Sequence, residues 1–174
     1  MPESGNTDFQ TETRRQRKEK NMAKKTEVKT EKAFGDFHSA DEINRCAAGL
    51  KAEGDTESLK AMAEENGIEP DIVTLYLDGE IPELCDESTA AEGRIKTELN
   101  EIEGRETMTA EGIAAFLRSR LDDPNVCRAV MDGGHTLTGA AKKMWSEAEK
   151  NKTNQSYCMG PDKSIPFMEE YYGI

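Results

Sequence analysis

The chain has 174 residues, of which 35% are apolar and 6% aromatic, and 35 acidic against 23 basic residues give a formal net charge of −12. This length suits one domain with a small appendage, and the scarcity of aromatic residues favours a helical core of Leu, Ile, Ala and Met. No apolar run approaches the roughly 20 residues of a membrane span, and the polar N-terminus lacks a secretory signal, so we expect a cytoplasmic protein that does not bind membranes.

The acidity is concentrated in one part of the chain. Residues 1–33 hold nine basic and six acidic residues, a net of +3, whereas residues 34–111 hold six basic and twenty-one acidic residues, a net of −15. Residues 112–174 hold eight of each. We predict that residues 1–33, which contain almost no apolar side chain, are a disordered basic leader. An acidic helical region over residues 34–106 and a C-terminal helical region over residues 107–174 follow it.

Three short helices are predicted between residues 39 and 79. In the first, Ser39 and Glu42 form a capping box, and apolar residues follow at helical spacing. The stretch "DIVTLYL" at residues 71–77 contains strand-forming residues, but the preceding proline and the spacing of its apolar residues favour a helix. The predicted starts are Ser39, Asp55 or Thr56, and Pro70, and the predicted ends are Gly54, Gly67 and Gly79.

A longer helix is predicted from Pro82 to Glu103. A break near Ser88 remains open, because Thr89 and Glu92 have the spacing of a second capping box. In the C-terminal half we predict helices beginning at Thr109, Pro124 and Thr136, then a polar loop over residues 150–164 and a final helical turn or two. With no convincing strand anywhere, the sequence predicts an all-α fold of short capped helices.

No motif in the sequence predicts catalysis, a cofactor or a metal. The four cysteines (Cys46, Cys85, Cys127 and Cys158) form no CxxC pair, and only two histidines accompany them, so we expect reduced and mostly buried thiols. The "DGGHT" stretch at residues 132–136 resembles a phosphate loop only superficially, because no Lys-Ser or Lys-Thr pair follows it. We therefore expect a binding protein and not an enzyme.

One acidic stretch is the strongest functional signal. No lysine or arginine lies between Lys60 and Arg94. Like charges at helical spacing repel each other, and a single lysine would relieve that repulsion. A solvated acidic face that maintains solubility is one interpretation, and a surface that mimics the phosphates of DNA is the other. The ten acidic residues are Glu64, Glu65, Glu69, Asp71, Asp78, Glu80, Glu83, Asp86, Glu87 and Glu92.

Three segments of the C-terminal half suggest a family. They are "EGIAAFLRSRLDDPNVCRAVM" from residue 111, "HTLTGAAKKMWSEAEKN" from residue 135 and "FMEEYYGI" from residue 167. Together they resemble the PcfK-like proteins of conjugative elements in gut bacteria, a group that includes inhibitors of type II CRISPR effectors. The segment "FHSADEINRCAAGLKAEGD", from residue 37, is similar to a module that precedes such domains.

The resemblance implies an anti-CRISPR protein whose partner is a Cas9-type nuclease with its guide RNA. The acidic stretch predicts how it acts, because carboxylates can occupy the cationic channel that holds DNA and the arginines that read the PAM. We expect no direct binding of DNA by this protein. The alternative is a conjugation accessory protein that binds a relaxase or a coupling protein.

Overall fold

The fold is taken from a computed structural model, which describes residues 33–151 and 159–174. Those residues form helices and contain no strand, so the all-α prediction is confirmed for them. The predicted leader, apart from Ala33, lies outside the described residues, as do Cys158 and half of the predicted polar loop. The elements are α2 (Ala40–Glu53), α3 (Thr56–Glu65), α4 (Pro70–Asp78), α5 (Glu87–Glu101), the 3-10 turn η2 (Gly104–Glu106), α6 (Thr107–Arg118), α7 (Pro124–Met131), α8 (Leu137–Lys150) and α9 (Pro161–Tyr172).

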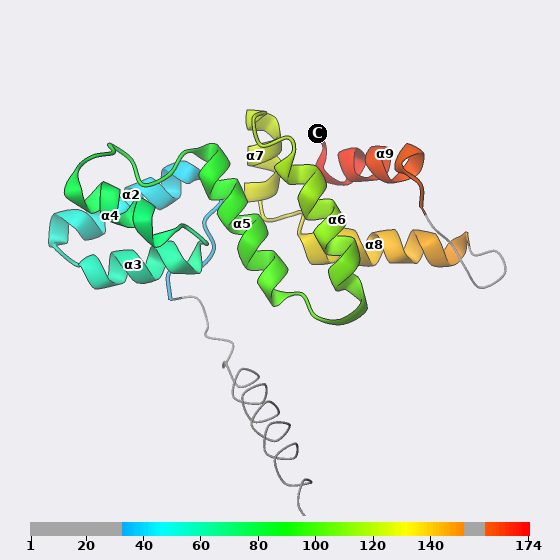
Figure 1. The fold of residues 1–174 in the computed structure, drawn as a ribbon, viewed down its shortest axis with the longest axis horizontal. Helices are drawn as coiled ribbons and strands as arrows, with labels where there is room; N and C mark the ends of the chain where they lie inside the picture. Colours follow the sequence, from blue (N-terminus) through cyan, green and yellow to red (C-terminus); the bar gives the residue numbers. More distant parts are fainter. Residues whose placement is uncertain (1–32, 152–158) are drawn as a thin grey trace, which may run out of the picture. The chain divides into compact units, whose positions relative to one another are not determined.

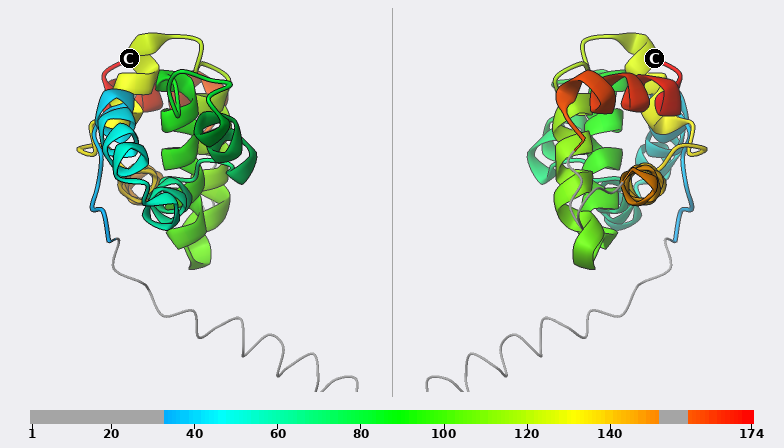
Figure 2. Two further views of the ribbon diagram at one scale, coloured as in Figure 1. Left: turned by 90° about the vertical axis from the view of Figure 1, so that its left-hand side faces the viewer. Right: turned by 90° about the vertical axis from the view of Figure 1, so that its right-hand side faces the viewer.

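Helix α5 is the central element of the fold. It contacts α2, α6, α7 and α8, and Figure 1 shows it between the group α2–α4 and the group α6–α9. In the left view of Figure 2, α2 and α3 lie on one side of α5 and α4 lies on the other, and the right view shows the side with α6, α8 and α9. Ala33–Ile174 is one compact unit, so the acidic and C-terminal regions of the sequence share one core.

Most of the predicted helix starts are confirmed. The Ser39 hydroxyl accepts the backbone N–H of Glu42 at 3.2 Å, and the Thr136 hydroxyl accepts that of Gly139 at 3.1 Å. The Glu42 carboxylate does not bond Ser39 in return but accepts the N–H of His38, at 2.7 Å. Such bonds satisfy N–H groups that the first turn of a helix leaves unpaired. The other confirmed starts are at Asp55, Pro70 and Pro124.

The predicted start at Pro82 is wrong, and the alternative of a break near Ser88 is close to the structure: α5 begins at Glu87, with Asp86 as its N-cap, and ends at Glu101 instead of Glu103. Asn44 on α2 explains why the segment before α5 is a loop and not a helix. Its amide nitrogen donates to the carbonyl of Cys85 at 2.8 Å, and its amide oxygen accepts the N–H of Cys85 at 3.0 Å. This pair of bonds holds the chain between α4 and α5 against α2 as a loop and buries Cys85.

Three other boundaries differ from the prediction. Helix α3 is capped by Asn66 instead of Gly67, and α6 begins at Thr107 instead of Thr109 because η2 leads directly into it. Helix α9 begins at Pro161 and is therefore longer than one or two turns. Its contacts with α7 and α8 provide tertiary stabilisation that the local sequence does not reveal.

The predicted apolar faces form the core. Cys85 and Cys127 are buried free thiols and Cys46 is a partly exposed one, which confirms the thiol prediction for the described cysteines. The predicted inward residues that are buried include Ile43, Ala47, Leu59, Met62, Ala63, Val73, Tyr76, Ala91, Ile95, Ile113, Leu117, Val126, Val130, Leu137, Ala140, Ala141, Met168 and Tyr172.

The backbone of α5 lies directly against the backbone at the end of α3, with no side chain between them. A Cβ atom added to Gly93, in the middle of α5, would overlap the carbonyl oxygen of Asn66. A Cβ atom added to Gly67, whose φ is 68°, would lie 2.5 Å from the carbonyl oxygen of Gly93. Because no side chain fits between these two backbones, glycine at both positions allows α5 to pack directly on the turn between α3 and α4.

We predict that Gly93→Ala lowers the free energy of unfolding by about 1–3 kcal/mol, because the added methyl group forces the two backbones apart. The matched control is Gly112→Ala in α6, where a Cβ atom meets nothing within 4 Å. That change should raise the free energy of unfolding by about 0.5–1 kcal/mol through helix propensity. Urea denaturation measures both variants, and equal stability of the two would contradict the close approach.

Candidate partner-binding surface

The carboxylates of six of the ten acidic residues make no hydrogen bond or ion pair with any described residue, and all six residues are exposed. They extend from the last turn of α3, through α4 and the loop after it, to the first residue of α5. We call them the six free carboxylates: Glu64, Asp71, Asp78, Glu80, Glu83 and Glu87.

Two of the remaining acidic residues tie other segments to α3 and α4. The Glu65 carboxylate accepts the backbone N–H groups of Ala33 at 3.0 Å and Phe34 at 3.2 Å, and so anchors the start of the compact unit. Glu69, the N-cap residue of α4, forms an ion pair with Lys96 on α5. These two carboxylates therefore hold the acidic region together.

The other two acidic residues are Glu92, which lies in α5, and Asp86, which is the N-cap of α5. Glu92 binds Arg118 of α6 through both of its oxygens, with N–O distances of 2.7–3.0 Å. The Asp86 carboxylate accepts the backbone N–H of Thr89 at 2.7 Å, and this bond lowers the pKa of the Asp86 carboxyl. Both side chains stabilise α5 or its packing.

The basic residues of this region do not neutralise the six free carboxylates. From the absence of basic residues between Lys60 and Arg94 we expected no basic partner for the ten acidic residues. This expectation is wrong for Glu69 and Glu92, because packing places Lys96 beside Glu69 and Arg118 beside Glu92. Every base in residues 34–111 is engaged elsewhere: Arg45 with the Asp41 carbonyl, Lys51 with the Tyr76 carbonyl, Lys60 with Glu57, Arg94 with Glu98, Lys96 with Glu69, and Arg105 with Glu106 and Glu149.

Helix α4 presents two of the free carboxylates on one face. Asp71 and Asp78 are seven residues apart, which places them two turns, or about 10 Å, apart along that face. Leu75 lies between them and is 39% exposed. Asp78 is the last residue of α4, where the helix dipole disfavours negative charge. The helix dipole therefore does not favour a carboxylate at that position, although the Lys51 ammonium donates to the Tyr76 carbonyl in the same turn.

Asp41 is an exposed carboxylate that the sequence analysis did not select. Together with Glu83, Asn44 and the basic residue Arg45 it lines a cleft of about 570 Å³ between α2, α4 and the loop after α4. The hydrogen bonds between Asn44 and Cys85 bring this loop to α2 and so place Glu83 near Asp41. The sequence offers only one signal for Asp41, its place in the first turn of a helix, where acidic residues are common.

A further group of carboxylates lies at the N-terminal ends of α5 and α7. Burial is the main cause that raises the pKa of the Cys127 thiol, and the charges of Glu87, Asp86 and Asp123 raise it further. Burial and neighbouring carboxylates also raise the pKa of Cys85 to about 12. Neither thiol is therefore a nucleophile near neutral pH.

The described residues contain no group of three or more His, Cys, Asp or Glu side chains that could hold a metal ion. The "DGGHT" stretch is a turn that leads into the Thr136 cap, and His135 packs edge-on against Tyr171 with ring centroids 5.3 Å apart. Across the two described ranges, no helix combines the length and apolar character needed to cross a bilayer.

Comparison of the chain with protein-family models, with curated proteins and with solved structures gave no match.

We predict a pH-dependent difference between the wild-type protein and Asp86→Asn. Asparagine caps a helix as aspartate does but carries no charge. Because the Asp86 pKa is lowered in the folded state, the stability that its carboxylate provides is present above its unfolded-state pKa and is lost as the pH falls through the lowered value. In urea denaturation, the wild-type advantage over Asp86→Asn at neutral pH should shrink as the pH falls and disappear once the Asp86 carboxyl is protonated in the folded state.

The Asp86→Ala variant is the control for the hydrogen bond itself. It should lose about 1 kcal/mol relative to Asp86→Asn at every pH, because alanine cannot cap the helix. A wild-type advantage over Asp86→Asn that stays constant down to the lowest pH would contradict this role for the Asp86 charge.

Proposed function

We propose that this protein is an anti-CRISPR protein that binds a guide-loaded Cas9-type nuclease through an acidic, DNA-mimicking surface and blocks the binding of target DNA. The observation that supports this proposal is the set of six free carboxylates between residues 64 and 87, which are exposed and have no basic partner among the described residues. On this proposal the protein acts in the cytoplasm of a bacterial host, uses no cofactor and catalyses no reaction.

The chemistry of the nuclease explains why carboxylates would inhibit it. Such nucleases read the PAM with arginines in the major groove and hold the guide–target duplex in a positively charged channel. A carboxylate accepts the same paired N–H donors of an arginine that a guanine edge or a phosphate accepts. Carboxylates on α4 and the loop after it would therefore compete with DNA for these arginines.

The cost of the charges to the fold also supports a binding role. Asp78 opposes the dipole of its own helix, and the free carboxylates repel one another without a base to relieve them. Charges that fold stability does not require are typical of surfaces that attract a partner of opposite charge. We therefore assign partner contact to the six free carboxylates and a structural role to Glu65, Glu69, Asp86 and Glu92.

The alternative is a conjugation accessory protein, which the resemblance to PcfK-like proteins favours. Its partner would be a relaxase or a coupling protein and not a nuclease of the CRISPR system. A pull-down with a guide-loaded Cas9-type nuclease separates the two functions, because only the anti-CRISPR protein would be retained.

We predict that reversing four of the free carboxylates weakens binding to the guide-loaded nuclease by at least about tenfold. The variant is Glu64→Lys, Asp71→Lys, Asp78→Lys and Glu83→Lys. It leaves Glu65 unchanged, because the Glu65 carboxylate holds the start of the compact unit. Binding of the wild-type protein should also weaken as salt rises, since exposed charges are screened. Titration of labelled inhibitor at several salt concentrations measures both effects.

A matched variant controls for the change in net charge. Glu101, Glu103, Glu111 and Asp122 are exposed and form no ion pair or side-chain hydrogen bond with any described residue. Changing all four to lysine alters the net charge equally and should leave binding nearly unchanged. Equal loss of binding in both variants would indicate a non-specific charge effect, and full inhibition by the first variant would place the contact elsewhere.

We further predict that Asp78→Asn separates binding from stability. Removing the charge at the C-terminal end of α4 should raise the free energy of unfolding by about 0.3–1 kcal/mol. The same change should weaken binding to the nuclease, because one of the contacting carboxylates is lost. Urea denaturation and the binding titration test the two effects, and a variant that is both less stable and an unchanged binder would contradict this role of Asp78.

A further inference from the structure

A cleft lies beside the backbone contact between Gly93 and Gly67. It has a volume of about 560 Å³ and lies between the end of α3, the start of α4 and α5. From α5 it is lined by Lys96, Thr97 and Asn100, which follow Gly93 by one and two turns and so share its face of the helix. The close approach of the two backbones therefore brings polar side chains of α5 to the start of α4.

This cleft adjoins the six free carboxylates. Glu64, one of the six, is also one of the residues that line the cleft. Thr74 lines it from α4 and lies one turn after Asp71 and one turn before Asp78, on the same face of that helix. A partner that contacts the carboxylates of α3 and α4 would therefore also cover the cleft.

The cleft has one charge without a partner. Its lining contains four charged side chains, two of them lysines. Lys60 pairs with Glu57 at 3.2 Å, and Lys96 pairs with Glu69. The Glu64 carboxylate bonds no described residue. Because both lysines are already paired with carboxylates, the cleft complements a group that carries a single positive charge.

The hydrogen-bonding groups of the lining select a donor. The Thr74 hydroxyl donates to the Pro70 carbonyl and the Thr97 hydroxyl donates to the Arg94 carbonyl, each at 3.0 Å, so both hydroxyl oxygens can still accept. The amide of Asn100 has no hydrogen-bond partner among the described residues and supplies one more acceptor oxygen. A guanidinium group carries five N–H donors and no acceptor, which matches a lining rich in acceptors.

The floor of the cleft is apolar. Ile68 and Val73 contribute to it and are only 4% and 3% exposed, so packing in the core fixes their positions. Pro70 lies beside them and is exposed. The methylene stem of a long basic side chain can lie along such a floor while its charged end stays at the rim.

We propose that this cleft binds a single arginine side chain of the protein partner. The methylene stem lies along Ile68, Pro70 and Val73, and the guanidinium donates to the Glu64 carboxylate and to the neighbouring oxygens. This inference deepens the proposed function and rests on it for the source of the arginine, which would belong to the DNA-binding channel of the nuclease. The chemistry of the cleft itself can be tested without the nuclease.

The first test uses the full-length protein and N-acetyl-arginine amide, with binding followed through methyl signals in NMR spectra. The probe should shift the signals of Ile68 and Val73 with a millimolar Kd. N-acetyl-citrulline amide, in which an uncharged urea replaces the guanidinium, should bind at least about threefold more weakly. N-acetyl-lysine amide should also bind more weakly, because its ammonium cannot make paired hydrogen bonds.

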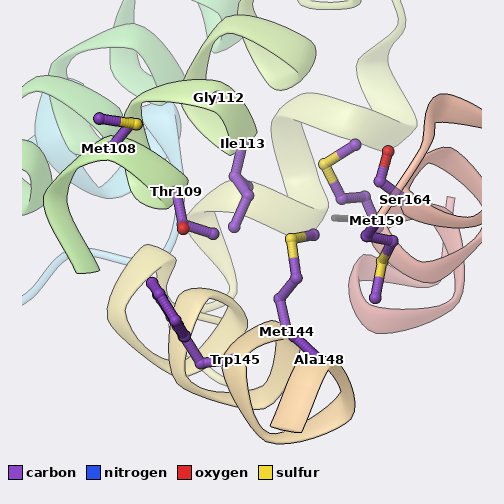
Figure 3. Close-up of a pocket in the computed structure, with 10 residues that line it drawn as sticks. Met108, Thr109, Gly112, Ile113, Met144, Trp145, Ala148, Met159 and Ser164 are labelled. Carbon is purple, nitrogen blue, oxygen red and sulfur yellow. The ribbon is translucent and has the colours of Figure 1, made fainter. Parts of the chain in front are cut away.

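A second cleft of the protein is the internal control. It lies between α6, α8 and α9, and none of its lining residues is charged. Figure 3 shows Ile113 and Met144 pointing toward each other across this second cleft. Their methyl signals should stay in place when the arginine probe is added, because nothing in that lining attracts a guanidinium.

The Glu64→Gln variant tests the unpaired charge. The side chain keeps its size, and the fold should be unaffected because the Glu64 carboxylate bonds no described residue. Binding of the arginine probe should weaken by about threefold to fivefold, the effect of one partly exposed ion pair. The matched control is Glu53→Gln at the end of α2, where an exposed glutamate with no bond to a described residue lies outside the cleft, and it should bind the probe as the wild-type protein does.

Four outcomes would overturn the assignment of an arginine. They are equal binding of the lysine or citrulline probe, the same shifts with N-acetyl-glutamate amide, unchanged binding by Glu64→Gln, and no shift of Ile68 and Val73 at millimolar probe. Shifts confined to the cleft and weakened in Glu64→Gln would support it.

The same two variants, titrated against the guide-loaded nuclease, separate this inference from the proposed function. Weaker binding by Glu64→Gln alone would support both. Retention of the nuclease with equal affinity by both variants would overturn the arginine contact and leave the inhibition standing. Binding of the probe without retention of the nuclease would support the cleft and contradict the proposed partner.

Discussion

The direct backbone contact between α5 and the α3–α4 turn determines how the acidic region is arranged. Gly93 on α5 and Gly67 on the turn leave no room for a side chain between them, so the turn from which α4 starts lies directly against α5, and Val73 and Tyr76 of α4 are buried in the core. The opposite face of α4, with Asp71 and Asp78, is thereby exposed. The same helix α5 contacts α6, α7 and α8, so one element positions both the acidic surface and the C-terminal helices.

The acidic residues fall into two classes that their sequence does not distinguish. Carboxylates such as Glu65 and Glu92 bond the backbone or an arginine and contribute to the fold. The six free carboxylates bond no described side chain and repel one another. Asp71 and Glu87 lie in first turns, where the helix dipole favours them, whereas Asp78 opposes the dipole of α4. A protein this small has a modest stability to lose, which makes an unneutralised surface expensive unless a cationic partner compensates for it.

Local signals predicted most of the fold, and long-range contacts account for what was missed. Ser39, Gly54, Pro70 and Thr136 act on residues within one turn, so the sequence alone identifies them as helix boundaries. The loop before α5 depends on Asn44 bonding Cys85, 41 residues away, which overrides the helical pattern after Pro82. Likewise, the pairing of Glu92 with Arg118, 26 residues apart, and the cleft that Asp41 shares with Glu83 arise only from packing.

The most direct test of the acidic-surface account measures binding of a fluorescent PAM-containing duplex to the guide-loaded nuclease at saturating concentrations of this protein. If the carboxylates occupy the arginines that read the PAM, fluorescence anisotropy should show that the duplex no longer binds, and that excess duplex competes with the protein. Normal binding of the duplex in the presence of bound protein would contradict the account, even if cleavage of the DNA were inhibited.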